Sequence, residues 1–171
     1  MKRFFDFSLA VFLIFVLWFI IIISAILVKI TSKGNALYWS DRVGINNKIF
    51  KMPKFRSMLI DTPAVATHLL DNPDVYLSPI GGFLRSTSLD ELPQLFSVLK
   101  GDMSFVGPRP ALYNQDDLIA LRTEKGVDKL LPGITGWAQV NGRDELSIPD
   151  KVALDVEYLN RQSFWFDVKI L

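Results

Sequence analysis

The sequence predicts an α+β protein in which a membrane-embedded N-terminal helix (residues 1–33) precedes a small mixed domain of helices and a β-hairpin (residues 34–171). Two observations predict this division. Residues 7–28 carry no charge and would form a helix of about 33 Å, close to the thickness of a bilayer's hydrocarbon core. The rest of the chain is rich in charged and turn-forming residues, and its length suits one compact domain.

The apolar run has two other interpretations. A cleaved signal peptide would also begin with basic residues such as Lys2 and Arg3, but this run exceeds the usual apolar core of a signal peptide and no A-x-A-like site follows it. Lys29 and Lys33 make the run basic at both ends, which is compatible with a helix that enters the bilayer and returns to the cytoplasmic face. A helix that spans the bilayer is the simpler interpretation of its length.

Charge is unevenly distributed along the chain. Residues 29–56 hold seven basic residues and one acidic residue, whereas residues 57–171 hold ten basic and sixteen acidic ones. A basic zone beside an apolar helix suits an anionic bilayer or a phosphorylated lipid, although the usual basic flank of a membrane helix explains part of it. Nucleic acid is a poor partner for this distribution. The chain has no cysteine, which excludes disulfides and thiolate metal sites.

The domain divides into short elements. Residues 36–39 and 48–51 read as strands joined by a hairpin loop at residues 44–47. Residues 57–77 are ambiguous, with a possible short helix between two prolines that would carry His68 as a surface residue. Apolar residues at helical spacing predict amphipathic helices, some of them at the bilayer surface, over residues 93–99, 111–125 and 149–161. We expect the aromatic residues 164–166 to fill the core rather than to contact a membrane.

Asp90 and Glu91 stand together at an expected helix start. Ser88 and Glu91 fit a capping box, and acidic residues are favoured in a first turn, so a structural role is one interpretation. A helix start is also a place where phosphate binds. There, one carboxylate can attack phosphorus while the other holds Mg²⁺ with the help of phosphate oxygens.

Arg109 follows nineteen positions after Asp90, between two prolines that stiffen its backbone. A guanidinium held in this way suits a diphosphate, although a lone arginine can equally pair with a surface acid. Lys54 and Arg56 share one face of a strand-like stretch and are candidates for phosphate or for lipid headgroups. The glycine-rich segment ending at residues 141–143 is a weaker candidate for a nucleotide cradle.

Four motifs together resemble the bacterial sugar transferases, the small monotopic polyprenyl-phosphate phosphoglycosyl transferases. They are Lys54-Phe55-Arg56-Ser57-Met58, the segment from Arg85 to Gln94, the segment from Lys100 to Pro110, and the segment from Pro132 to Arg143. They occur in the family's order and cover nearly the whole chain. The chain departs from the family at Trp18-Phe19, where relatives break the membrane helix with a Ser-Pro pair, and at Leu131, where many relatives have a basic residue.

The resemblance implies transfer of a sugar 1-phosphate from a UDP-sugar to undecaprenyl phosphate, with release of UMP, on the cytoplasmic face of the bacterial inner membrane. It implies that Asp90 forms a covalent phosphosugar intermediate and that Glu91 binds Mg²⁺. Arg109 would contact phosphate, supported by Lys54 and Arg85. Gln139, Asn141 and Arg143 are the further substrate-binding candidates.

Two rival hypotheses remain at this stage. A membrane-anchored scaffold would explain the apolar helix and the amphipathic helices, but it would not explain why Asp90, Glu91, Arg109 and Lys54 occur together. Within the enzyme class, Asp90 could act instead as a base in direct single-step transfer. The identity of the sugar and the oligomeric state do not follow from the sequence.

Overall fold

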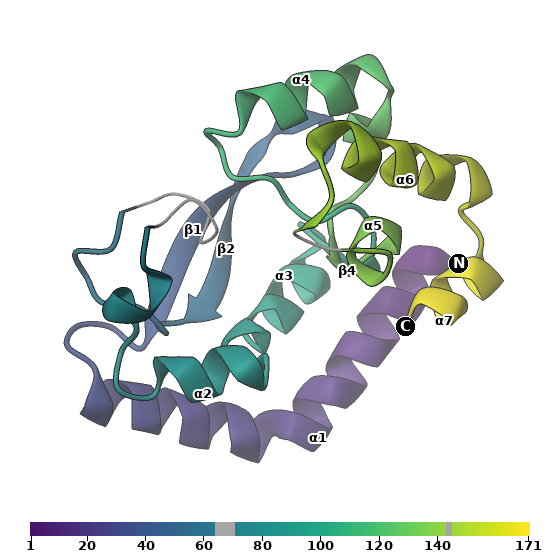
Figure 1. Cartoon of the computed structure of the whole chain (residues 1–171). Coiled ribbons are helices and arrows are strands. Elements are labelled where there is room, and N and C mark those ends of the chain that lie inside the picture. The colour runs from purple at the N-terminus through teal and green to yellow at the C-terminus, as the bar shows by residue number, and fades with distance from the viewer. Residues whose placement is uncertain (64–70, 143–144) are drawn as a thin grey trace.

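The computed structural model describes residues 1–63, 71–142 and 145–171. Figure 1 shows a long helix α1 that runs along one side of a mixed domain of short helices and strands. The elements in chain order are α1 (Lys2–Thr31), β1 (Leu37–Val43), η1 (Ile45–Asn47), β2 (Ile49–Phe55), η3 (Pro73–Tyr76), α2 (Gly81–Ser86), η4 (Leu89–Glu91), α3 (Gln94–Lys100), β3 (Ser104–Val106), α4 (Asp116–Glu124), η5 (Val127–Lys129), β4 (Gly133–Thr135), α5 (Trp137–Val140), α6 (Ile148–Arg161) and α7 (Phe164–Ile170).

Helix α1 is long and apolar enough to cross a membrane, and 11% of its most apolar window is buried. The helix packs on the domain near its two ends: Ala10 joins the main core, and Val28 packs with Phe55 and Leu84. Between these contacts one face of the helix is exposed, with Phe15 at 77% and Trp18 at 55%, whereas Ser24 is 3% exposed. Figure 1 shows the helix changing direction near its middle, so that both halves follow the domain.

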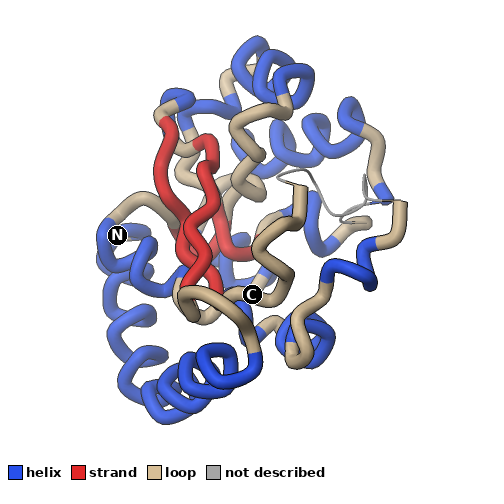
Figure 2. Tube along the Cα trace, turned by 90° about the vertical axis from the view of Figure 1, so that its left-hand side faces the viewer, coloured by secondary structure: helices blue, strands red, loops and turns tan. Residues whose placement is uncertain are grey.

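Strands β1 and β2 form the predicted hairpin, which is antiparallel and pairs Leu37 with Phe55 at one end and Val43 with Ile49 at the other. Figure 2 shows the pair as one long twisted ribbon. The strands are longer than the sequence predicted, because β1 continues past residue 39 through Asp41 to Val43 and β2 continues past residue 51 through Pro53 to Phe55. The side chains of the hairpin are therefore spread over the distance from its turn at η1 to the paired residues Leu37 and Phe55.

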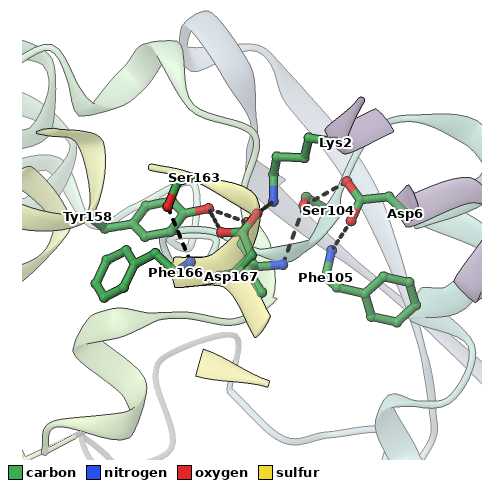
Figure 3. Close-up of polar contacts among 9 residues, drawn as sticks. Lys2, Asp6, Ser104, Phe105, Tyr158, Ser163, Phe166 and Asp167 are labelled. Carbon is green, nitrogen blue, oxygen red and sulfur yellow. Dashed lines mark hydrogen bonds and ion pairs between the residues drawn. The ribbon is translucent and has the colours of Figure 1, made fainter. Parts of the chain in front are cut away.

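A second, parallel pair of short strands, β3 and β4, was not predicted. Its strand β3 is held by α1, since the Asp6 carboxylate accepts hydrogen bonds from the Ser104 hydroxyl (2.9 Å) and the Phe105 N–H (3.3 Å). Figure 3 shows this contact beside a second one, in which Asp167 of α7 pairs with Lys2 (2.6 Å) and with the Tyr158 hydroxyl (2.7 Å). The start of α1 is thus tied to β3, α6 and α7 by buried polar groups.

Two expectations for the rest of the chain differ from the structure: the start of the helix expected at residues 111–125 and the burial of residues 164–166. Helix α4 begins at Asp116 rather than at residue 111, because the residues before it pair with the hairpin: Val43 N–H donates to Ala111 O (3.0 Å). The aromatic end is divided, with Phe166 in the core and Trp165 78% exposed. Phe164 is also exposed, at 47%, so the expected core role of residues 164–166 is wrong for Phe164 and Trp165 and is confirmed for Phe166. His68 lies outside the described residues.

Candidate active site

Asp90 and Glu91 lie on the short helix η4, between α2 and α3. The capping interpretation of this segment is wrong, because Ser88 has a left-handed backbone (φ 56°) and its side chain caps nothing. A serine in this conformation is strained, and strain of this kind is common at functional sites. The turn leaves Asp90 8% exposed and directs Glu91 toward the hairpin.

Glu91 is held by basic residues from two distant segments. Its Oε1 lies 2.7 Å from Nζ of Lys54, on β2, and 3.6 Å from a terminal guanidinium nitrogen of Arg109. The Lys54 and Glu91 side chains are 16% and 17% exposed, whereas that of Arg109 is 34% exposed. The fold therefore brings together three of the residues singled out in the sequence, and it leaves the Arg109 guanidinium partly open to a ligand.

These residues line a cavity of about 460 Å³ between the hairpin, η4 and the loop of Arg109. Among the described residues that line it, seven are basic and two are acidic. The basic ones are Arg42, Lys54, Arg56, Arg85, Arg109, Arg122 and Lys151, and the acidic ones are Asp90 and Glu91. Such an excess of positive charge in a partly buried site favours an anionic ligand with several phosphate oxygens.

Burial sets the electrostatics of the cavity. Burial raises the pKa of the Asp90 carboxyl, while Lys54 and Arg85 act in the opposite direction. Burial lowers the pKa of the Lys54 ammonium, with Glu91 opposing the shift. Burial and the neighbouring Arg109 lower the pKa of Arg42 to about 10, so it is still charged at neutral pH. A bound anion would reduce the repulsion between the positive charges of Arg42 and Arg109.

Arg42 and Arg122 were not singled out in the sequence. Arg42 lies on β1, where alternation places Tyr38, Ser40 and Arg42 on the face that lines the cavity. That two-residue pattern, matched by Lys54 and Arg56 across the hairpin, is the signal that would have identified Arg42. Arg122 reaches the cavity from α4, and nothing in its local sequence distinguishes it from a surface arginine.

The candidates of the Pro132–Arg143 segment are placed differently. Gln139 Nε2 donates to Ile134 O (2.9 Å) and Asn141 Nδ2 donates to Trp137 O (2.8 Å), and neither residue lines the cavity. Arg143 lies outside the described residues. A substrate role for these three residues stays a prediction.

The glycines of this segment have a structural explanation. A Cβ on Gly133 would lie 2.2 Å from Gly107 N, and one on Gly136 would lie 2.1 Å from Gly107 O. Gly107 itself is equally confined, since its Cβ would lie 2.3 Å from Leu131 O. The glycines thus let the β4 segment pack directly against the loop that carries Arg109.

The donor set fits a magnesium ion only if a substrate completes it. Within the described residues there is no group of three His, Cys, Asp or Glu side chains arranged for a metal. Asp90 and Glu91 supply two adjacent carboxylates in a cavity that suits phosphate. Mg²⁺ commonly binds one or two carboxylates together with substrate phosphates and water, so this pair is compatible with it.

The long apolar helix fits a membrane-associated protein, and the basic cavity around a carboxylate pair suits an anionic ligand. Comparison with known proteins identifies the family. The model of the family described as "Bacterial sugar transferase" matches residues 1–171. The chain therefore belongs to the bacterial sugar transferase family, which confirms the family indicated by its motifs.

Individual relatives share about two residues in five with this chain. It is 41% identical over 173 residues to the uncharacterized sugar transferase EpsL of Bacillus subtilis, covering 100% of the chain and 83% of that protein. It is 39% identical over 179 residues to the UDP-glucose:undecaprenyl-phosphate glucose-1-phosphate transferase of Escherichia coli, covering 100% of the chain and 38% of that protein. It is 40% identical over 162 residues to the undecaprenyl-phosphate galactose phosphotransferase of Salmonella typhimurium, covering 84% of the chain and 33% of that protein. The chain thus spans about a third of the length of the last two.

Proposed function

We propose that this protein transfers a sugar 1-phosphate from a UDP-sugar to undecaprenyl phosphate and releases UMP, and so begins the assembly of a lipid-linked glycan. The names of the Escherichia coli and Salmonella relatives support this class of reaction. The observation that carries the proposal is the cavity itself. A buried carboxylate, Asp90, lies beside Glu91 in a site whose other charged lining groups are seven basic ones, which suits a nucleophile facing a diphosphate.

In the proposed reaction, an Asp90 oxygen attacks the phosphorus that carries the sugar. The bond between that phosphorus and the oxygen of UMP breaks, and UMP leaves with the electron pair. A phosphate oxygen of undecaprenyl phosphate then attacks the same phosphorus, and the Asp90 carboxylate is regenerated as the leaving group. The route through a covalent intermediate lets one cavity serve both anionic substrates in turn.

The basic residues hold the phosphates in this scheme. The partly open Arg109 guanidinium provides two parallel donors for phosphate oxygens, while Lys54 and Arg85 lower the cost of ionising Asp90. Glu91 is oriented by its ion pair with Lys54 and is the residue that would hold Mg²⁺. Bound there, the ion would neutralise charge on the phosphate oxygens.

The proposed acceptor is confined to a membrane, so the cavity must lie at the bilayer surface. Helix α1 carries exposed apolar residues along most of its length, and Trp165 of α7 lies near its start, where the Phe5 and Phe164 rings are 5.3 Å apart. Both ends of α1 contact the same domain through buried residues. These contacts support a helix that enters the bilayer and returns on the cytoplasmic side.

Release of UMP tests the proposal. Purified protein in lipid nanodiscs should release UMP over many turnovers from at least one member of a panel of UDP-sugars when undecaprenyl phosphate and Mg²⁺ are both present. Without undecaprenyl phosphate, release should stop at about one UMP per protein molecule. A protein with Glu124→Gln, an exposed change outside the cavity, should behave like the wild type. If no UDP-sugar yields UMP or a lipid-linked sugar, the proposed function is wrong and the scaffold hypothesis gains support.

A further inference from the structure

The loop that carries Arg109 is held almost entirely by its carbonyl groups. Pro108 and Pro110 have no N–H, so the loop offers few donors through which the rest of the protein could fix it. Each carbonyl from residue 108 to residue 111 instead accepts a hydrogen bond. The donors are Gly133 N–H to Pro108 O (2.9 Å), Arg122 to Arg109 O (2.8 Å), Arg42 to Pro110 O (3.1 Å) and Val43 N–H to Ala111 O (3.0 Å).

The donor to Arg109 O, Arg122, is itself held in place by an ion pair. Arg122 projects from α4 and is 8% exposed, and its Nε and one terminal nitrogen lie 2.9 Å and 2.7 Å from a single oxygen of Asp155. Asp155 belongs to α6 and is 1% exposed. The remaining terminal nitrogen of Arg122 donates to Arg109 O. Because the guanidinium is planar and rigid, its pairing with Asp155 fixes the direction in which the remaining terminal nitrogen donates to Arg109 O.

Stability alone does not explain why this position holds a buried ion pair. Moving two charges into a protein interior costs about as much as their attraction returns, and apolar residues of similar size often replace such pairs without loss of stability. Apolar residues are at hand, since Leu118 of α4 and Val152 of α6 belong to one buried cluster with Ala111. What an apolar pair could not supply is the donor to the carbonyl of Arg109.

We propose that Arg122, oriented by Asp155, is a positioning residue that sets where the Arg109 guanidinium stands in the cavity. Arg122 acts through the loop, because its nitrogens are used by Asp155 and by Arg109 O. The expected effect of Arg122 on turnover rests on the proposed function, whereas its expected effect on the position of the Arg109 loop is independent of that function.

The first experiment measures the loop directly by hydrogen exchange in peptides that cover residues 107–115. The test variant is R122M/D155L, which replaces the pair by apolar side chains of similar size. Exchange in these peptides should be about fivefold or more faster than in the wild type, while exchange in residues 148–161 is unchanged. The matched control is E124Q/K125Q, which removes an exposed ion pair at the end of the same helix and should leave loop exchange unaltered.

The second experiment is a double-mutant cycle with Arg109→Ala, read as UMP release. R122M/D155L should lower kcat/KM by about tenfold when Arg109 is present and by less than about twofold when it is absent. An equal loss in both backgrounds would mean that Arg122 acts on the substrate or on the fold rather than through Arg109. Should the apolar variant fail to fold, D155N, which keeps the volume and weakens the hold on Arg122, should give the same pattern.

The two readouts separate the inference from the function on which it partly rests. Wild-type protein that releases no UMP would refute the proposed function, and loop exchange would still decide whether Arg122 holds the loop. Unchanged loop exchange in both R122M/D155L and D155N overturns the inference, whatever the activity.

Discussion

Asp90 is a buried carboxylate. Because burial raises its pKa, keeping Asp90 ionised costs the folded protein free energy relative to the unfolded chain. Lys54 and Arg85 offset part of that cost. A role in catalysis explains why the protein holds a carboxylate at this position, whereas a role in stability does not.

Replacing Asp90 should therefore separate stability from activity. Asp90→Asn preserves size and removes the buried charge, so thermal stability should be equal or higher, while UMP release falls by about three orders of magnitude or more. Thermal unfolding and UMP release of the same preparation check both parts. Asp117→Asn, an exposed change on α4, is the control. An Asp90→Asn protein with the wild-type rate would remove Asp90 from the mechanism.

The pH dependence should report the same carboxyl. Because burial raises the pKa of Asp90, kcat/KM should fall on the acidic side at a higher pH than the ordinary value of 3.8 would give. Lys54 favours the ionised form, so Lys54→Met should raise the pKa of Asp90 and move the acidic limb to still higher pH. Profiles of kcat/KM against pH for both proteins measure the shift.

Lys48→Met, an exposed change on the loop before β2, serves as the control and should leave the limb in place. A limb that stays fixed or moves to lower pH in Lys54→Met would show that another group sets the acidic side of the profile.

Among the helices and strands, those whose formation depends on nearby residues were predicted from the sequence. The hairpin followed from two apolar stretches around Gly44, and helix α6 followed from Val152, Val156 and Leu159 at helical spacing. Asp90, Glu91, Lys54, Arg85 and Arg109 were named from sequence motifs and lie around one cavity. Chemistry concentrated in short motifs is visible before the fold is known.

What the sequence did not predict depends on contacts between distant segments. Strands β3 and β4 have three residues each, too few for an alternating pattern, and they pair only because glycines let the two segments approach closely. Residues 111–115 have a helical pattern but join β1 instead, through the bridge between Arg42 and Leu112. Arg122 was not identified because its orientation depends on Asp155 of α6, which lies 33 residues further along the chain.

The tie between α1 and β3 gives a prediction at this scale. Asp6→Leu would leave the Ser104 hydroxyl and the Phe105 N–H buried without an acceptor, and should lower the free energy of unfolding by about 3 kcal/mol. Asp6→Asn retains one acceptor and should cost less. Thermal or denaturant unfolding in nanodiscs measures both. Asp74→Leu, at an exposed position, is the control.

If Asp6→Leu unfolds like the wild type, α1 is held on the domain by apolar packing alone, and the polar contacts in Figure 3 contribute little.

For the whole molecule, the central feature is a helix long enough to cross a bilayer whose two ends contact one domain. We predict that both ends lie on the cytoplasmic side. Single cysteines placed directly after Met1 and at Lys33 should both react with a membrane-impermeant thiol reagent only after the cytoplasmic side is opened. The chain has no native cysteine, so the labelling is unambiguous. Labelling of the N-terminal cysteine from outside would show that α1 spans the membrane.

The most direct test of the account is the mass of the protein after incubation with a UDP-sugar in the absence of undecaprenyl phosphate. The proposed mechanism predicts a protein heavier by one sugar phosphate, with the added mass on the peptide that contains Asp90. The added mass should disappear when undecaprenyl phosphate is supplied, and it should never form on the Asp90→Asn protein. If UMP release with acceptor is normal and no adduct forms without it, the covalent route through Asp90 is wrong and transfer is direct.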